Sequence, residues 1–251
     1  MARKLLLLAC CAIIALYAAN PCPAQEAGAP AGAPAASAPA APAEDADQGP
    51  TVLDVLAGVE KRYGKGGVCG KFFQEAVLAG VGVSDFASGT VCFKYPDKMY
   101  WLYTDPEEQL VVSDGKTLWI FRKADNQVMM GDAAAFFGEG DGAGFLADVA
   151  GLRKRFALAW ATDKLSSPWV REGWYAIKLI PYKPRPEFTV LYLAIDKKTF
   201  EVRESISENE HGDQTRIVYT DLDFSAPMED GKFTFSPGPG TEVLTLDDME
   251  K

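Results

Sequence analysis

The chain has 251 residues, a formal net charge of −10 and a single histidine. This length allows one or two domains, and the acidic balance argues against nucleic acid and anionic lipid headgroups as partners. One histidine and five cysteines also give little material for a metal site, which usually needs several such ligands close together.

Residues 1–24 have the three regions of a secretory signal peptide. Arg3 and Lys4 supply positive charge, residues 5–16 form an apolar run, and a proline-containing stretch ends at the small residue Ala24. The apolar run is shorter than the roughly 20 residues that a transmembrane helix needs. We therefore expect cleavage after Ala24 and export to the periplasm.

Lipid attachment at an N-terminal cysteine is the alternative that we weigh and disfavour. Cys10 has only five apolar residues directly before it, and Cys22 follows an Asn-Pro pair that fits a lipidation signal poorly. Cleavage after the signal would leave only Cys69 and Cys92. Because two cysteines in an oxidising compartment tend to pair, we expect a disulfide if their strands are neighbours, and two separate buried thiols otherwise.

Residues 25–50 are low in complexity and rich in Ala, Pro and Gly. Such a segment cannot form a core, so we expect a flexible, partly extended linker. The folded domain is expected over residues 51–248, a length that can bury a substantial core in one unit.

The domain begins with the pattern of an amphipathic helix from Thr51 to Tyr63. Thr51 is a good N-cap residue, and glycines follow the segment from Gly64 onward. Apolar residues recur at the spacing of one helix face, at Val52, Val55, Leu56 and Val59.

After this helix the apolar residues alternate with period two, as in strands. Asp114-Gly115 is a tight hairpin signal between two of them. The predicted strands are Val68–Leu78, Gly89–Tyr95, Lys98–Thr104, Gln109–Ser113, Thr117–Arg122, Gln127–Gly131, Phe156–Thr162, Trp174–Pro181, Thr189–Asp196, Glu201–Glu208 and Thr215–Asp223, with short segments at Phe233–Phe235 and Glu242–Leu244. About eleven antiparallel strands predict a mainly β fold with one large, strongly curved sheet.

The middle of the chain interrupts this pattern. Residues 133–137 and 145–152 look like two short helices, separated by a glycine-rich stretch at 138–144. That stretch matches neither a P-loop nor a dinucleotide-binding motif, and a hinge between the helices is the simpler interpretation.

Alternation places large apolar side chains together on single strand faces. These residues are Met99, Trp101 and Tyr103; Trp119 and Phe121; Ile177 and Leu179; and Leu191 and Leu193. The helices look too few and too short to cover so wide an apolar face densely. Alternation leaves two interpretations open, a filled sandwich core and a partly vacant cavity.

Several of these segments resemble one known family. The segments are Phe73-Gln74, Ser88-Gly89-Thr90, Lys94-Tyr95-Pro96, Met99-Tyr100-Trp101, Pro106–Trp119, Asp213–Tyr219 and Phe233–Pro237. In this order, over about Leu53 to Leu244, they resemble the LolA family of periplasmic carriers that take lipoproteins to the outer membrane. Pro106–Trp119 is the most specific part.

The resemblance implies a single antiparallel sheet curved into an unclosed half-barrel, with helices as a lid over a hydrophobic cavity. It implies partners as well: the acyl chains of lipoproteins, an inner-membrane ABC transporter that releases them, and an outer-membrane acceptor lipoprotein. Neither a metal nor an organic cofactor is implied, and we expect a monomer. The strand residues above would line the cavity, and the lid would add Phe136, Phe137, Phe145 and Leu146.

One position departs from the family pattern. An arginine that hydrogen-bonds to the lid often precedes the proline that matches Pro96, and here Tyr95 stands in its place. Tyr95 is therefore a candidate lid latch, acting through its hydroxyl or by packing, and we favour packing. The cysteine pair is an addition to the pattern, and a hairpin turning near Gly80 would bring Cys69 close to Cys92.

No catalytic pattern is present, so we expect a binding protein that is not an enzyme. His211 stands alone in a turn, and neither GxSxG nor HExxH occurs in the sequence. Two other functions on the same fold stay open, a regulatory module that senses lipids or lipoproteins and a membrane-anchored acceptor.

Overall fold

The computed structural model describes residues 49–64, 66–134, 144–162, 173–183, 186, 188–225 and 227–245. The predicted signal peptide, almost all of the predicted linker and the last residues of the predicted domain lie outside these ranges. Within the described ranges, no helix is long and apolar enough to cross a bilayer.

Helix α1 spans Val52–Tyr63, as the sequence predicts. The Thr51 hydroxyl oxygen accepts a hydrogen bond from the Asp54 N–H (3.2 Å), and the Asp54 carboxylate accepts one from the Thr51 N–H (2.9 Å). This reciprocal capping box satisfies N–H groups that the first turn would otherwise leave unpaired. The buried residues of α1 are Val55, Leu56, Val59 and Tyr63.

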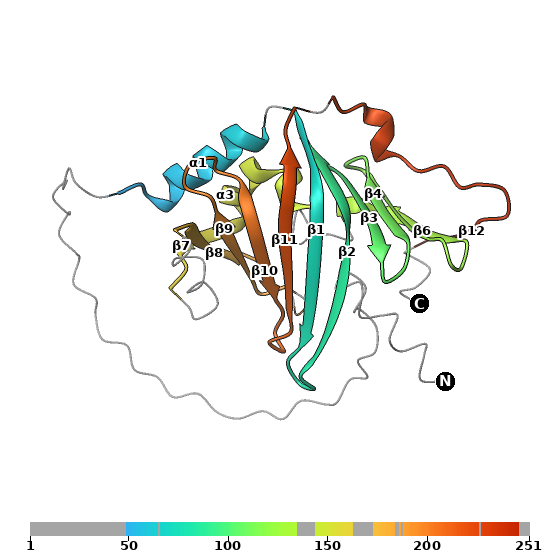
Figure 1. Cartoon of the computed structure of the whole chain (residues 1–251), viewed down its shortest axis with the longest axis horizontal. Coiled ribbons are helices and arrows are strands. Elements are labelled where there is room, and N and C mark those ends of the chain that lie inside the picture. Colours follow the sequence, from blue (N-terminus) through green and yellow to red (C-terminus); the bar gives the residue numbers. More distant parts are fainter. Residues whose placement is uncertain are drawn as a thin grey trace, which may run out of the picture.

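Twelve strands among the described residues form one sheet, in the order β12-β6-β5-β4-β3-β2-β1-β11-β10-β9-β8-β7 (Figure 1). The strands are β1 (Gly67–Leu78), β2 (Val83–Lys94), β3 (Lys98–Asp105), β4 (Gln109–Ser113), β5 (Thr117–Arg122), β6 (Gln127–Asp132), β7 (Phe156–Trp160), β8 (Tyr175–Pro181), β9 (Val190–Ile195), β10 (Val202–Glu208), β11 (Gln214–Asp223) and β12 (Glu242–Thr245). The order ends at β12 and β7, so the sheet is open, as predicted.

Strand β2 is longer than its sequence pattern indicates. It begins at Val83 rather than Gly89 because its first half pairs with the end of β1, where Leu78 lies opposite Val83. The result is the long central hairpin that extends beyond the rest of the sheet in Figure 1.

The end of the chain differs from the prediction of an entirely antiparallel sheet. Phe233 closes a short 3-10 helix, η5 (Asp230–Phe233), instead of starting a strand. The last strand, β12, pairs with β6 in parallel orientation. The physical reason is that the segment after β11 is held on the outer face of the sheet, so it returns to the β6 edge by a crossover instead of a hairpin.

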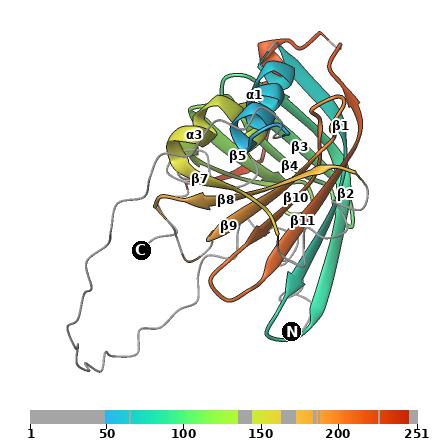
Figure 2. The same ribbon diagram turned by 90° about the vertical axis from the view of Figure 1, so that its left-hand side faces the viewer.

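The inner face of the sheet carries the main core. It is covered by α1, two 3-10 turns, η2 (Phe145–Ala147) and η3 (Val149–Gly151), and the single-turn helix α3 (Leu152–Arg155). Figure 2 shows the curvature of the sheet, with α1 and α3 on its inner side.

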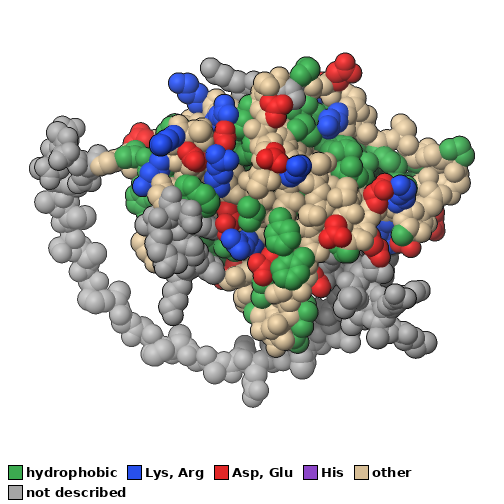
Figure 3. Space-filling model, viewed as in Figure 1, with side chains coloured by type: hydrophobic (Ala, Val, Ile, Leu, Met, Phe, Trp, Pro, Cys, Tyr) green, Lys and Arg blue, Asp and Glu red, His purple; other side chains and the backbone are tan. Residues whose placement is uncertain are grey.

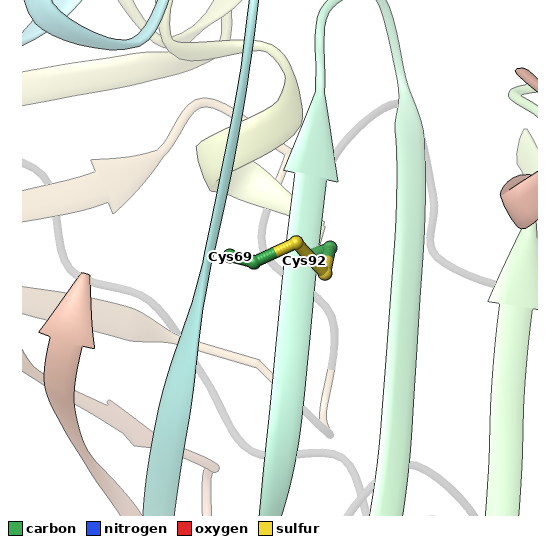
Figure 4. Close-up of a disulfide and its surroundings, with 2 residues drawn as sticks. All are labelled: Cys69 and Cys92. Carbon is green, nitrogen blue, oxygen red and sulfur yellow. A yellow bond between two sulfur atoms is a disulfide. The ribbon is translucent and has the colours of Figure 1, made fainter. Parts of the chain in front are cut away.

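The outer face carries a smaller apolar cluster around the predicted disulfide. Cys69 and Cys92 lie directly opposite each other on β1 and β2 and are bonded (Figure 4). Cys92 packs with Phe233, which is fully buried. The Asp230 carboxylate fixes this segment to the sheet by accepting hydrogen bonds from Lys94 (2.7 Å) and by pairing with Lys98 (2.9 Å), and these bonds lower the pKa of Asp230 to about 2.

Candidate binding site

An aromatic cluster forms the centre of the inner wall. Period-two alternation along β3 points Met99, Trp101 and Tyr103 to the inner face, where they are 2%, 1% and 4% exposed. The Trp101 ring meets those of Phe72 and Phe93 edge-to-face, with centroids 4.8 and 5.6 Å apart. These positions agree with the sequence prediction for β3.

Buried polar groups lie within this apolar wall. The Tyr103 hydroxyl donates to the Gln74 side-chain oxygen (3.0 Å), and the Tyr219 and Ser205 hydroxyls are 3.3 Å apart. Burial raises the pKa of Tyr219 above its ordinary value, so its hydroxyl stays protonated. The Trp101 indole N–H is buried and has no hydrogen-bond partner in the structure as described.

The aliphatic part of the wall comes from β8 and β9. Ile177 lies opposite Leu193, and Leu179 opposite Leu191, and directly opposed residues share a face. All four belong to the main core with exposed fractions of 2% or less and therefore lie on the inner face; that they contact acyl chains stays a prediction.

From the cover, Phe145 and Leu146 of η2 are 2% and 3% exposed and pack into the same core. These two predicted residues therefore do face the wall. Phe136 and Phe137 lie outside the described residues.

Trp119 and Phe121 lie on the other side of the sheet, and their assignment to the inner wall is wrong. Trp119 is opposite Val112, and both pack in the outer-face cluster that contains the disulfide. Phe121 packs against Phe235, with ring centroids 5.0 Å apart. Residues 118–121 are apolar at every position, so the alternation does not show whether residues 118 and 120 or residues 119 and 121 face inward.

The inner-wall residues of β5 are instead Leu118 and Ile120, with exposed fractions of 0% and 1%. Sequence reasoning also missed Phe72, Phe93 and Tyr219. The expected pairing of Cys69 with Cys92 could have found Phe93, because the residue next to an outward cysteine faces inward.

The turn after β2 joins the sheet to the cover through its backbone. The Asp97 N–H donates to the Ala147 carbonyl oxygen of η2 (3.2 Å). Tyr95, the candidate latch, is 51% exposed and lines a pocket of about 110 Å³ together with Leu146 and Ala147.

Three charged side chains meet at this junction. Arg155 pairs with Asp148 (3.3 Å), whose carboxylate also accepts a hydrogen bond from the Gly151 N–H (3.1 Å). Partial burial and the neighbouring Asp148 raise the pKa of Asp97, and Arg155 partly offsets this rise. The negative charge of Asp97 therefore opposes the contact that its own backbone makes with η2.

Helix α1 is fixed to the sheet by side chains. The Tyr63 hydroxyl oxygen accepts a hydrogen bond from the Val202 N–H (3.0 Å), and Arg62 pairs with Glu201 (2.6 Å). Arg62 also lies over the Phe224 ring, 3.7 Å from its centroid. A further ion pair, Arg153 with Glu60 (2.9 Å), connects α1 to α3.

Together these features define a class of protein: an open half-barrel whose apolar inner wall is covered by one long helix and several short turns. A family model described as outer membrane lipoprotein carrier protein LolA matches residues 66–236. The chain belongs to the LolA family.

Relatives with the same description are similar to this chain at low identity. An outer-membrane lipoprotein carrier protein of Chromobacterium violaceum is 28% identical over 166 residues, which cover 66% of this chain and 76% of the relative. One of Cupriavidus taiwanensis is 28% identical over 187 residues, covering 70% and 80%. A solved LolA-superfamily protein of Nitrosomonas europaea has 12% identity and a TM-score of 0.42, covering 74% of this chain and 99% of that one.

Proposed function

We propose that this chain is a periplasmic carrier that shields the acyl chains of lipoproteins against its inner wall. The observation that carries the proposal is the continuous apolar wall of β1–β11 beneath a cover of α1 and several short turns, in a chain of the LolA family. The N-terminal signal pattern supports a location in the periplasm.

Burial of hydrocarbon supplies the binding energy. Each methylene removed from water contributes about 0.8 kcal/mol, so ten methylenes contribute roughly 8 kcal/mol before the costs of association. Release then requires an acceptor with an equally favourable apolar site, and no bond in the cargo has to break. In this proposal an inner-membrane ABC transporter loads the carrier, an outer-membrane acceptor lipoprotein unloads it, and the carrier acts as a monomer without catalysis.

Loading requires movement of the cover, because its side chains occupy the described part of the wall. The segment 144–155 is the favoured moving part. Its turn η2 meets the β2–β3 turn through the backbone hydrogen bond from Asp97 to Ala147. The end of the segment is held by the Arg153–Glu60 ion pair and by the Tyr182 N–H, which donates to the Arg155 carbonyl oxygen. The turn η2 is therefore the part that can move, while α1 stays fixed by Tyr63 and Arg62. Tyr95 acts by packing at the rim of this junction.

A release assay tests the proposal. Inner membranes that hold labelled lipoproteins are incubated with the purified mature chain, and the soluble fraction is analysed for complexes. We expect lipoprotein to leave the membrane as a complex that contains one lipoprotein molecule for each molecule of the carrier chain. Recovery of the chain without lipoprotein would contradict the proposal, and binding of free lipid alone would favour a lipid-sensing module.

A locked variant serves as the matched control. Asp97→Cys with Ala147→Cys, made in a Cys69→Ser/Cys92→Ser background, joins the cover to the sheet when oxidised. We expect the oxidised form to release no lipoprotein and the reduced form of the same protein to regain the activity. Equal activity in both forms would show that segment 144–155 does not have to move.

A further inference from the structure

Among the described residues, three buried aromatic side chains on the strands of the inner wall carry polar hydrogens, and they differ in one respect. Tyr103 donates to Gln74, and Tyr219 lies within hydrogen-bond distance of Ser205. The Trp101 indole N–H is buried without a hydrogen-bond partner in the part of the chain that the structure describes. Among the described residues, the Trp101 indole nitrogen is therefore a wall atom without a hydrogen-bond partner.

Leaving a buried donor unpaired costs about 1–3 kcal/mol, and such groups are few in native proteins. The rings next to Trp101, Phe72 and Phe93, meet it edge-to-face. A ring face is only a weak acceptor, so these contacts leave the N–H able to bond to an oxygen. If the wall only had to be apolar, a phenylalanine at position 101 would serve equally well and would avoid the cost of the unpaired N–H.

A carrier of acyl chains provides an acceptor of the right kind. The indole N–H is a donor only, and a hydrocarbon tail offers nothing to accept its hydrogen. The acceptor nearest to the tail in an acyl group is the carbonyl oxygen of its ester or amide. A buried donor that pairs with this oxygen gives preference to acyl chains over alkyl chains of equal length, because an ether lipid lacks the carbonyl oxygen and offers only an ether oxygen at a different position.

Resting on the proposed function, we propose that Trp101 donates its indole N–H to a carbonyl oxygen of the bound acyl groups and so selects ester- or amide-linked lipid over ether-linked lipid. Trp101 is then a specificity-determining residue of the inner wall. Among the described residues the donor has no partner, and we expect it to gain one when the cover moves aside and a lipid takes its place.

Two lipids that differ only in the carbonyl test the proposal. Dipalmitoyl phosphatidylcholine and its dihexadecyl ether analogue are titrated as dispersed monomers into the full mature chain, and both dissociation constants are measured. We expect the wild type to bind the ester about threefold to tenfold more tightly, the size of one net hydrogen bond. Trp101→Phe should bind the two lipids equally.

Trp119→Phe is the matched control, because it also removes an indole N–H, but from the outer face of the sheet, and leaves Trp101 in place. It should keep the preference for the ester. If Trp101→Phe does not fold, the indole N–H resonance of Trp101 in the wild type decides the question: we expect it to shift downfield with the ester lipid and not with the ether lipid.

The failures are distinguishable. Equal binding of both lipids by the wild type, or a preference that survives Trp101→Phe, overturns the role of Trp101 and leaves the carrier function standing. Binding of neither lipid, together with no lipoprotein in the release assay, overturns the proposed function and this inference with it.

Discussion

At the residue scale, Gly58 shows how closely α1 approaches the β9–β10 turn. A Cβ at this position would collide with the ring of Phe200, whose own backbone has a positive φ of 56°. Glycine inside a helix ordinarily costs about 1 kcal/mol relative to alanine. At position 58 the helix needs a glycine because the Phe200 ring occupies the space that a Cβ would take.

We therefore expect Gly58→Ala to destabilise the protein by about 1–3 kcal/mol, because it overpacks this contact. In a Phe200→Ala background the same change should stabilise by up to about 1 kcal/mol, through helix propensity alone. Urea unfolding of the four proteins measures both effects. Stabilisation by Gly58→Ala in the wild type would show that the ring moves aside freely.

Asp97 provides a pH-dependent prediction. Its backbone has a positive φ of 57°, which asparagine also tolerates, so Asp97→Asn removes only the charge. The pKa of Asp97 is raised in the folded state. A carboxyl whose pKa is raised on folding makes the folded protein less stable as the pH rises from the unfolded-state pKa through the folded-state pKa.

The variant should therefore match the wild type near pH 3 and exceed it at pH 7. Because Asp97 is exposed, we expect a small gain, about 1–2 °C in Tm, as for other surface charges. Thermal melts from pH 3 to 7 provide the measurement. A variant that is less stable than the wild type at pH 7 would mean that the attraction to Arg155 outweighs burial and the repulsion from Asp148.

The limits of sequence reasoning are clearest at single residues. Met99, Trp101 and Tyr103 alternate with less buried neighbours, so period two assigns their face. Trp119 stands in a strand that is apolar on both sides, because the chain's last segment covers its outer face. That cover comes from residues more than a hundred positions further along, and a local pattern contains no information about it.

At the element scale, the disulfide joins the two longest strands next to the sheet's centre. Cys69 and Cys92 are 23 residues apart, and closing a loop of this size stabilises a fold by about 2–4 kcal/mol. The β1–β2 hairpin has twelve paired positions of its own. The bond therefore adds stability to a hairpin whose pairing does not depend on it.

The double variant Cys69→Ser/Cys92→Ser should fold, and its free energy of unfolding should fall by about 2–4 kcal/mol. The far-ultraviolet circular dichroism spectrum checks the fold, and urea titration measures the loss. The oxidised wild type compared with its reduced form provides the control without a mutation. A double variant with no ordered sheet would instead assign the bond an essential role in pairing.

Local signals predicted some elements well. Strands β4 and β5 begin and end where the sequence predicts, because Asp114-Gly115 provides the turn between them and the Asp114 side chain accepts from the N–H groups of Lys116 and Thr117. Strand β12 could not be placed in the same way. Its partner β6 lies far away in sequence, and the parallel pairing requires a crossover that no turn motif marks.

At the scale of the whole molecule, loading should stabilise the fold. A ligand that binds only the folded state adds RT ln(1 + [L]/Kd), about 2.7 kcal/mol at a hundredfold excess over Kd. We expect Tm to rise with the concentration of monomeric acyl lipid, by about 5–11 °C at that excess for a domain of this size. Differential scanning calorimetry measures the rise in Tm. The control ligand is an apolar molecule that is too short to extend across the inner wall. An unchanged Tm with saturating lipid would contradict binding at a folded site.

The centre of the sheet also bears on how the protein is made. Strand β1, near the start of the domain, pairs along its length with β11, near the end, so that Phe72 lies opposite Tyr219. Pairings between such distant segments form late and slowly. A chain that emerges from the export machinery amino end first must therefore wait, with its aromatic residues unprotected, until nearly all of it has emerged. We expect the nascent protein to need a holding chaperone during that interval, and under the proposed function the folded protein would later shield the acyl chains of its cargo from water in the same way.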